Sequence, residues 1–195
     1  IKVLTVYAFS TENWKRPSGE VNYLMDLLVE YLHKELDELH ENNVIIRVSG
    51  DISVIPEKCR LEIKRALNKT ENNSGMIFNL ALNYGARHEI IRAVKKLTEK
   101  AIKKEIDLED ITEESFADLL YTGGLPDPDL LIRTAGEMRL SNFLLWQIAY
   151  TEFVVTDTLW PDFSEEDLYK SIIQFQQRDR KFGGLSENNK ERAGK

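Results

Sequence analysis

Two arginines and a serine lie in one short stretch of the chain and have the chemistry to bind a diphosphate. Arg133 and Arg139 supply two guanidinium groups, and Ser141 supplies a hydroxyl. Guanidinium groups bind phosphate oxygens in pairs, and a diphosphate presents many such oxygens in a small volume. The alternative is an internal ion pair between Arg133 and an acid such as Glu137 or Glu152.

A second polar cluster, at 10–17, follows an apolar run and combines a hydroxyl, an acid, an amide, an indole and two cations. Its candidate site residues are Ser10, Thr11, Glu12, Asn13, Trp14 and Arg16. In the functional interpretation, Arg16 binds an anionic group of a ligand and Trp14 packs over an apolar group. In the alternative the segment is a polar turn whose Trp14 folds back on the core.

Glu152 is a candidate metal ligand. It follows Trp146, Ile148 and Tyr150, and a carboxylate among aromatic side chains is costly to bury unless it is paired or metal-bound. Mg²⁺ takes one or two carboxylates together with water and substrate phosphates. Glu152 would therefore need a second acid or a diphosphate beside it to hold Mg²⁺.

Other polar groups carry weaker signals. The turn at 83–87 either orients a ligand or caps a helix, and the basic segment at 178–184 reads most simply as a helix end. His33, His40 and His88 lack metal-ligand spacing and are predicted to lie on the surface. The sequence contains no P-loop, dinucleotide-binding fingerprint, CxxC pair or Gly-x-Ser-x-Gly motif.

Strands and helices are predicted to alternate, and they place these clusters at strand ends. The apolar runs that predict strands are 1–9, 44–48, 76–82, 130–133 and 153–156. The helical patterns are 21–39, 56–67, 89–102, 112–120 and 164–175. The run 1–9 is apolar on both alternating faces, as in a strand buried on both sides. The alternation predicts a parallel α/β sheet with helices on both faces, whose ligands bind beyond the carboxyl ends of the strands.

Predicted helix starts rest on capping residues. Ser18 is the expected N-cap of the first helix and Thr112 of the fourth, and Pro56 is expected at the first position of the second. Ser164 and Asp167 have capping-box spacing.

Composition excludes some functions. The net charge of −7 argues against general nucleic-acid binding, which needs a basic surface. No apolar run approaches the roughly 20 residues that span a bilayer, and no signal peptide opens the chain at Ile1. Cys59 is the only cysteine, which fits a reducing cytoplasm, so we expect a cytoplasmic location.

Taken together, the clusters resemble the cis-prenyltransferase family, and the similarity is close to bacterial undecaprenyl diphosphate synthases. The segments that carry it run in the family order: YAFSTENWKRP (7–17), SGD (49–51), NLALNYGAR (79–87), DLLIRTAGEMRLSNFLLWQIAYTEF (129–153), LWPDF (159–163) and RKFGG (180–184). The ordered set is far more specific than any single piece.

The resemblance implies a role for each matching residue. It implies substrate contacts for Ser10, Thr11, Glu12, Trp14, Arg16, Arg133, Arg139, Leu140 and Ser141. Arg133, Arg139 and Ser141 match the residues that hold the diphosphate of isopentenyl diphosphate. Asn13 matches the position assigned as proton acceptor. Because an amide is a poor base in water, we expect Asn13 to orient the substrate or relay the proton. Glu152 matches a Mg²⁺ ligand.

The resemblance also implies the fold and the reaction. The expected fold is a single α/β catalytic domain over 1–184 with a polar tail at 185–195. The reaction adds isopentenyl diphosphate to an allylic diphosphate such as farnesyl diphosphate and forms a long polyprenyl diphosphate, expected to be undecaprenyl, for the peptidoglycan lipid carrier. The helix 21–39 and the strand 76–82 could line a tunnel for the growing chain, although the same side chains could equally be core.

The expected assembly is a homodimer in which RKFGG reaches the neighbouring subunit's site, with peripheral membrane contact for product release. The alternative function is a non-catalytic partner subunit of a heteromeric enzyme. Such subunits tend to lose substrate residues, whereas Arg133, Arg139, Ser141 and Glu152 are present here.

One part of the family pattern is absent. Members open with a D-G-N-x-R-W-A motif whose aspartate holds Mg²⁺ on the allylic diphosphate, and this sequence has none. We therefore expect a chain that lacks its amino-terminal part and is inactive alone. Turnover by this chain with Mg²⁺ and both substrates would contradict that expectation.

Overall fold

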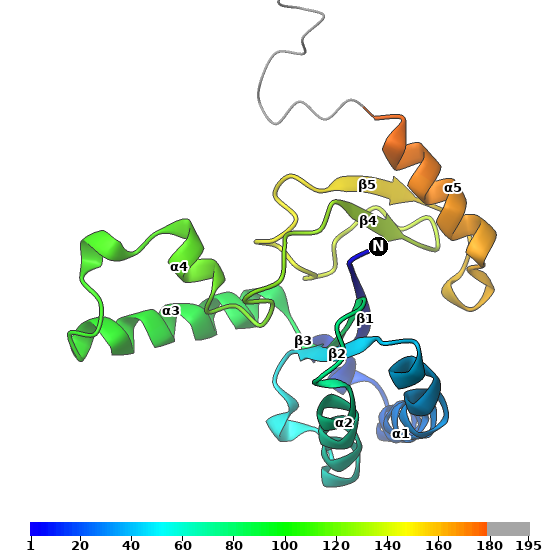
Figure 1. Cartoon of the computed structure of the whole chain (residues 1–195), viewed down its shortest axis with the longest axis horizontal. Coiled ribbons are helices and arrows are strands. Elements are labelled where there is room, and N and C mark those ends of the chain that lie inside the picture. The colour runs from blue at the N-terminus through cyan, green and yellow to red at the C-terminus, as the bar shows by residue number, and fades with distance from the viewer. Residues whose placement is uncertain (179–195) are drawn as a thin grey trace, which may run out of the picture. The chain divides into compact units, whose positions relative to one another are not determined.

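Strands and helices alternate along the chain in the computed structural model, which describes residues 1–178 (Figure 1). The strands are β1 (Val3–Ser10), β2 (Ile45–Ser49), β3 (Ile77–Tyr84), β4 (Leu130–Arg133) and β5 (Glu152–Val155). The α-helices are α1 (Ser18–Glu41), α2 (Glu57–Thr70), α3 (Ala86–Ile102), α4 (Glu113–Ala117) and α5 (Glu165–Gln176). The predicted α/β class, with parallel strands flanked by helices, is confirmed. The RKFGG motif and the predicted polar tail lie outside the described residues.

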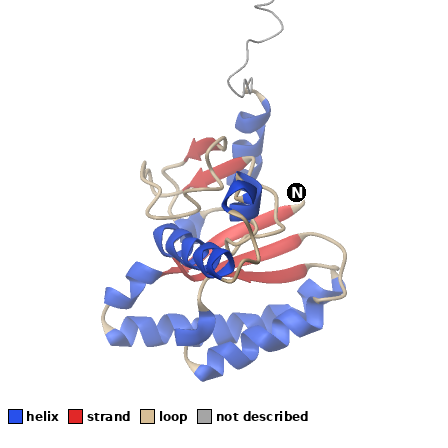
Figure 2. Ribbon diagram, turned by 90° about the vertical axis from the view of Figure 1, so that its left-hand side faces the viewer, coloured by secondary structure: helices blue, strands red, loops and turns tan. Residues whose placement is uncertain are grey.

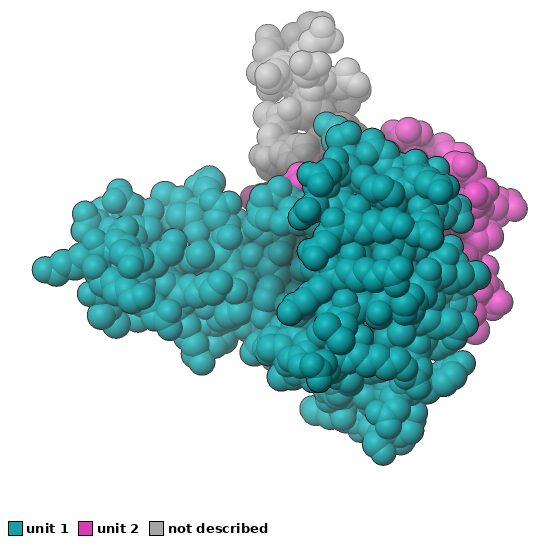
Figure 3. Space-filling model, turned by 60° about the horizontal axis from the view of Figure 1, so that its bottom comes forward, with its two compact units in different colours: residues 1–125, 142–144 teal, residues 126–141, 145–195 magenta. Residues whose placement is uncertain are grey.

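The described residues form two compact units, which Figure 3 shows in different colours. Unit 1 contains residues 1–125 and 142–144, and unit 2 contains residues 126–141 and the chain from 145 onward. Each unit has its own parallel sheet.

The sheet of unit 1 has the strand order β1-β3-β2, and Figure 2 shows the three strands side by side. A polar row crosses the sheet, because Asn79 Nδ2 donates a hydrogen bond to Thr5 Oγ1 at 3.2 Å and Ser49 Oγ donates one to Asn79 Oδ1 at 3.0 Å. Ser49 and Asn79 are fully buried, so these bonds offset the cost of removing them from water.

The hydrophobic core of unit 1 lies between α1, α2 and the sheet. The side chains that α1 contributes recur at helical spacing: Val21, Met25, Val29, Leu32 and Leu36. Leu80 and Leu82 of β3 pack into the same cluster. The helix and strand that the sequence suggests as tunnel walls therefore belong to this packed core.

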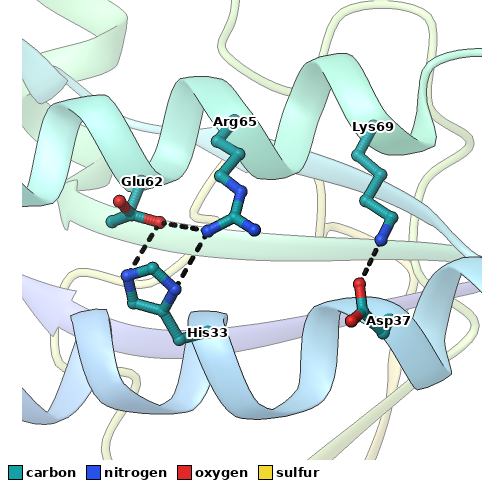
Figure 4. A network of polar contacts seen from close by, with 5 residues as sticks. All are labelled: His33, Asp37, Glu62, Arg65 and Lys69. Carbon is teal, nitrogen blue, oxygen red and sulfur yellow. Dashed lines mark hydrogen bonds and ion pairs between the residues drawn. The ribbon is translucent and has the colours of Figure 1, made fainter.

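Polar contacts join α1 and α2 along their exposed side (Figure 4). His33 Nε2 lies 3.2 Å from Glu62 Oε2, and Arg65 Nη1 lies 3.0 Å from His33 Nδ1. Lys69 pairs with Asp37 one turn further along. Pairs this exposed contribute about 0–1 kcal/mol each, so the buried apolar side chains hold the two helices together.

The prediction that the first strand is buried on both faces is wrong. Phe9 is buried, but Ala8 is exposed and Leu4 is 37% exposed. β1 lies at one end of the strand order, whereas β3 lies in the middle and is buried from Asn79 to Tyr84. An apolar run thus does not distinguish a central strand from an end strand.

Helix starts are predicted to within a few residues. Ser18 and Pro56 are each misplaced by one position, because Pro17 is the N-cap of α1 and Pro56 is the N-cap of α2. The capping residue of α4, Thr112, is confirmed, since its side chain accepts a hydrogen bond from Ser115 N. α3 begins at Ala86, earlier than the apolar periodicity predicts.

In unit 2, β4 and β5 pair in parallel and α5 follows. The predicted capping box of α5 is confirmed: Ser164 accepts from Asp167 N, and Asp167 in turn accepts from Ser164 N at 3.0 Å.

The predicted surface positions of the three histidines are confirmed. Across residues 1–178, no helix has both the length and the apolar character needed to cross a membrane.

Candidate active site

The end of β1 turns into a short 3-10 helix, Thr11–Lys15, where the sequence predicts a loop. Asn13 makes this turn, because its Oδ1 accepts a hydrogen bond from Ser10 N at 2.8 Å. That bond engages the amide oxygen, so the amide NH₂ is the part of Asn13 that can serve a ligand. The NH₂ group is therefore available as a hydrogen-bond donor.

Glu12 is held by its neighbour Thr11 and by the distant Asn142. Its Oε1 accepts from Asn142 Nδ2 at 2.8 Å, and its Oε2 accepts from Thr11 Oγ1 at 3.0 Å. Partial burial opposes ionisation, but the hydrogen bonds from Asn142 and Thr11 keep the pKa of Glu12 below its ordinary value. The carboxylate is therefore ionised at neutral pH, and it suits a cation or a hydroxyl donor.

Asn142 links this turn to the start of α3. Its backbone oxygen accepts from Ala86 N and its Oδ1 accepts from Arg87 N, both at 2.9 Å. Asn142 has a φ of 63°, a conformation that asparagine tolerates better than most residues. Sequence analysis did not select Asn142, and the only signal was an asparagine at the end of the arginine-rich segment.

The Trp14 side chain is held by two contacts and is still partly exposed to solvent. Its Nε1 donates to Asn83 Oδ1 at 2.8 Å, and its ring packs edge-on against Phe9 with centroids 5.1 Å apart. The side chain is nevertheless 38% exposed. Both sequence interpretations thus describe part of it: Trp14 touches the core and still presents apolar surface to a ligand.

Asn83, at the end of β3, belongs to the turn at 83–87, for which the sequence left open a ligand-orienting or a helix-capping role. It is buried, has a φ of 45°, and its Nδ2 donates to Asp51 O at 2.6 Å while its Oδ1 holds Trp14. Asparagine in this left-handed conformation is typical of functional turns, where strain of about 1–3 kcal/mol is held by surrounding contacts.

Arg16 does not join Glu12 and Asn13. Its Nη1 pairs with Glu20 Oε1 at 2.6 Å in the first turn of α1, and both side chains are exposed. An exposed pair of this kind breaks at little cost, so Arg16 can turn to an anion only by giving up Glu20.

Gly85 sets how closely the Thr11 turn approaches α3, and its replacement by alanine tests that packing. A Cβ there would lie 2.6 Å from Thr11 Oγ1 and 2.9 Å from Asn142 Nδ2. Because Gly85 has an extended φ of −158°, the effect is steric. We expect Gly85→Ala to lower kcat/KM by about 10- to 100-fold, since misplacement by about 1 Å has effects of this size.

The matched control is Gly19→Ala, because a Cβ at Gly19 meets nothing within 4 Å. Steady-state kinetics and thermal unfolding would be measured on both variants. Wild-type kinetics in Gly85→Ala would show that the position of Thr11 does not matter for turnover.

Aromatic side chains next to the turn pack against one another. Tyr7 stacks on Phe143 with centroids 4.5 Å apart, and its hydroxyl donates to Tyr84 O at 3.1 Å. Burial, with the nearby charge of Glu12, raises the pKa of Tyr7 to about 12. Tyr7 is therefore a neutral hydrogen-bond donor at physiological pH and not a proton acceptor.

In unit 2, the structure brings Arg133 and Ser141 together at the end of β4. Arg133 Nη2 lies 3.5 Å from Ser141 Oγ. The Nε of Arg133 is buried and has no hydrogen-bond partner among residues 1–178. A buried guanidinium donor without a partner is costly, and an anion at this position would satisfy it.

The backbone after β4 is shaped for a tight loop. Ala135, Gly136 and Ser141 all have φ between 50° and 63°, and Gly136 packs so closely that a Cβ would lie 2.9 Å from Asp157 Oδ1. Ala135 N and Gly136 N donate to Thr158 O and Thr156 O, which fixes the loop to the segment that follows β5. Positive φ at alanine and serine is uncommon and clusters at functional sites.

The predicted alternative, an ion pair of Arg133 with Glu137 or Glu152, is not what the described residues form. Glu137 pairs with Arg139, and Glu152 Oε2 accepts from Arg178 Nη1 at 2.7 Å. Arg139 is exposed and Leu140 is half-buried. Of the two arginines in this segment, Arg133 is therefore the one whose guanidinium forms no ion pair within residues 1–178.

Glu152 can supply one metal ligand. Its ion pair with Arg178 engages Oε2, and Oε1 has no hydrogen-bond partner among residues 1–178. No group of three or more His, Cys, Asp or Glu side chains in that part of the chain could hold a metal by itself. The residues present thus fit Mg²⁺ only if substrate phosphates and water complete its coordination.

Comparison with known proteins gives the same family from sequence and from structure. Residues 1–183 match the family model described as "Putative undecaprenyl diphosphate synthase". The isoprenyl transferases of Clostridium tetani and Bacillus subtilis are each 54% identical to this chain over 185 residues, covering 95% of it and 72% and 71% of those proteins.

Two solved structures share the fold. Lavandulyl diphosphate synthase from Lavandula x intermedia, in complex with dimethylallyl diphosphate, matches with a TM-score of 0.92 and 40% identity over 94% of this chain and 79% of that one. A probable undecaprenyl diphosphate synthase from Campylobacter jejuni matches with a TM-score of 0.82 and 39% identity, over 94% of this chain and 84% of that one. The chain therefore belongs to the undecaprenyl diphosphate synthase family of prenyltransferases.

Proposed function

We propose that this protein lengthens an allylic diphosphate by cis addition of isopentenyl diphosphate. The observation that carries the proposal is the buried Nε of Arg133, a guanidinium donor without a partner among residues 1–178, next to the hydroxyl of Ser141. A diphosphate offers this pair the acceptor oxygens that they lack. The relatives named isoprenyl transferases support the same class of substrate.

The reaction breaks the carbon–oxygen bond of the allylic diphosphate, and its diphosphate leaves. The double-bond electrons of isopentenyl diphosphate form the new carbon–carbon bond. A proton is then lost, and its electron pair becomes the new cis double bond. Arg133, Arg139 and Ser141 bind the diphosphate of isopentenyl diphosphate, so the nucleophilic carbon is held in one orientation.

The turn after β1 orients the substrates. Asn13 offers its NH₂ as a donor because its oxygen is engaged by Ser10 N. Trp14 presents its exposed surface to an apolar prenyl group, and Leu140 adds apolar contact in unit 2. Thr11 and Glu12 supply polar contacts. The proton lost in the reaction goes to diphosphate or water, since neither the Asn13 amide nor the neutral Tyr7 hydroxyl acts as a base at physiological pH.

Mg²⁺ fits this scheme as a cofactor that Glu152 holds with one carboxylate oxygen. When bound, the metal neutralises the negative charge that develops on a leaving diphosphate. Glu152 has to share its carboxylate with Arg178, or release Arg178, when the metal binds.

Several finer features belong to the same proposal. We infer farnesyl diphosphate as primer, an undecaprenyl product for the peptidoglycan lipid carrier, a cytoplasmic location, and peripheral membrane contact when the product leaves. We also infer a homodimer. The exposed apolar side chains of Val94 and Ile102 on α3 support it, because they leave surface for a second copy to cover. Sedimentation analysis would test the homodimer.

The test of function is incorporation of labelled isopentenyl diphosphate into butanol-extractable product by protein expressed from its complete gene, with farnesyl diphosphate and Mg²⁺. We expect incorporation that EDTA abolishes and that Arg139→Ala lowers by about tenfold or more, since charged hydrogen bonds contribute about 1.5–3 kcal/mol. Product length would then identify the polyprenyl chain. No incorporation by folded protein would refute the proposal and favour a non-catalytic partner subunit.

A further inference from the structure

A second basic site lies in unit 1, among residues that the candidate active site does not use. A cavity of about 630 Å³ is lined by the loop at 50–53, by α2 and α3, and by Tyr121. Five of its lining residues are basic: Arg60, Lys64, His88, Arg92 and Lys95. Cavities of roughly 300–1,000 Å³ are the size that small ligands occupy.

Acidic groups do little to neutralise this cavity. Among residues 1–178, Asp51 is the only carboxylate that lines it, and Ser53 N and Ser53 Oγ already donate to Asp51 Oδ1 at 2.9 and 2.6 Å. These hydrogen bonds from Ser53 hold the pKa of Asp51 below its ordinary value, and the charges of His88 and Arg92 act in the same direction. Lys64 and Lys95 form no ion pair among residues 1–178 and are exposed.

Arg92 is held in place before any ligand binds. Its guanidinium carbon lies 3.9 Å from the centre of the Tyr121 ring, and its Nη2 donates to Leu119 O at 2.7 Å. Its Nε is buried and has no hydrogen-bond partner among residues 1–178. A guanidinium that is stacked, fixed and still short of a partner loses little entropy when it binds an anion.

Arg60 is fixed in a similar way, because its Nη1 donates to Ser53 O at 2.9 Å. Two anchored guanidiniums and two free lysines thus face one cavity in a chain whose net charge is −7. The mutual repulsion of these clustered cations is unfavourable, and a bound anion would offset it.

We propose that this cavity binds a small anion with two phosphate groups, such as diphosphate. Arg60 and Arg92 offer planar forks for paired oxygens, while Lys64 and Lys95 act as point charges for the rest. One phosphate group would leave part of this cation set unused. The inference does not rest on the proposed prenyltransferase activity, because it concerns binding by residues outside that site.

The test is calorimetric titration of inorganic diphosphate into protein without Mg²⁺. The candidate active site is weakened in advance by Arg133→Ala and Ser141→Ala, which remove its main proposed diphosphate contacts, so that binding reports on the cavity. In this background we compare Lys64→Ala/Lys95→Ala with the control Lys96→Ala/Lys100→Ala. The control removes the same charge from exposed positions of α3 that do not line the cavity. All four lysines are exposed, so both pairs should leave folding intact, which thermal unfolding would check.

We expect diphosphate to bind to the background protein and to the control within about twofold of each other. In Lys64→Ala/Lys95→Ala we expect binding to weaken by about 100-fold, since each lost charged contact is worth about tenfold. Absence of binding in the background protein would overturn the proposal, as would equal binding by the two lysine pairs. Capture of a glutamate-rich peptide in place of diphosphate would also overturn it, in favour of a protein partner.

Discussion

Replacing Arg133 by alanine is expected to lower kcat/KM for isopentenyl diphosphate by about 100- to 1,000-fold. Truncation of one partner in a buried, charged hydrogen-bonded contact costs about 2–5 kcal/mol, which corresponds to a factor of this size. The Nε of Arg133 is buried without a partner, so a bound diphosphate would satisfy a donor that nothing else within residues 1–178 satisfies. Steady-state kinetics at saturating allylic diphosphate would measure the effect.

Arg133→Lys separates charge from geometry. Lysine keeps the positive charge but lacks the fork and has no counterpart of Nε, so we expect it to recover less than about tenfold of the loss. The control is Lys170→Ala in α5, whose exposed side chain pairs with Glu166. Equal kinetics for wild type and Arg133→Ala would remove Arg133 from the site.

Replacing Glu89 by alanine is expected to have the largest effect on stability, about 3 kcal/mol. Glu89 is fully buried at the start of α3, accepts a hydrogen bond from the Tyr84 hydroxyl, and holds Tyr121 N at 3.0 Å with its other oxygen. Its loss leaves two buried donors without acceptors, at about 1–3 kcal/mol each. In a chain of this size the melting temperature should fall by about 6–12 °C.

Glu89→Gln retains one amide oxygen as acceptor and should be milder than Glu89→Ala. Glu99→Ala is the matched control, because Glu99 is exposed on the same helix and should change stability by less than about 0.5 kcal/mol. Burial, with the neighbouring carboxylate of Glu89, raises the pKa of Tyr84 far above its ordinary value, so Tyr84 stays a neutral donor across physiological pH. A melting temperature for Glu89→Ala equal to that of Glu99→Ala would contradict this account.

Hydrophobic periodicity was enough to predict the elements, because their residues lie close together in sequence. The inward face of α1, from Val21 to Leu36, follows helical spacing, and the alternation of strands with helices predicts a parallel sheet. The burial of β1 could not be predicted in this way. An apolar run such as 1–9 predicts that its residues form a strand. How deeply that strand is buried depends on which other strands lie on either side of it.

The candidate site likewise contains residues that local sequence predicts and residues that it does not. Sequence analysis selected Arg133, Ser141 and Glu12 from their types and positions at strand ends. It treated the turn that contains Asn83 only as a weaker candidate, and it missed Asn142 and Glu89, although all three hold the site residues or their supports in place. The hydrogen bond between Asn142 and Glu12 spans 130 positions of the chain, and that between Trp14 and Asn83 spans 69. Contacts over such distances follow from the tertiary fold and leave no local pattern.

The role of Asn13 also changes once its partners are known. Its type leaves open whether the amide donates or accepts, and the resemblance points to a proton acceptor. The amide oxygen accepts a hydrogen bond from Ser10 N, so we expect the NH₂ group to be the part of Asn13 that serves a ligand. That expectation depends on the backbone geometry of the turn, which residue type alone does not give.

The most direct test of the central claim is equilibrium binding of isopentenyl diphosphate without an allylic substrate, where no turnover can occur. The account predicts that wild-type protein binds it and that Arg133→Ala weakens binding by about 100-fold or more, as loss of a buried charged contact requires. Lys170→Ala should bind as wild type does. Failure of folded wild-type protein to bind isopentenyl diphosphate, or equal affinity in Arg133→Ala, would contradict the account.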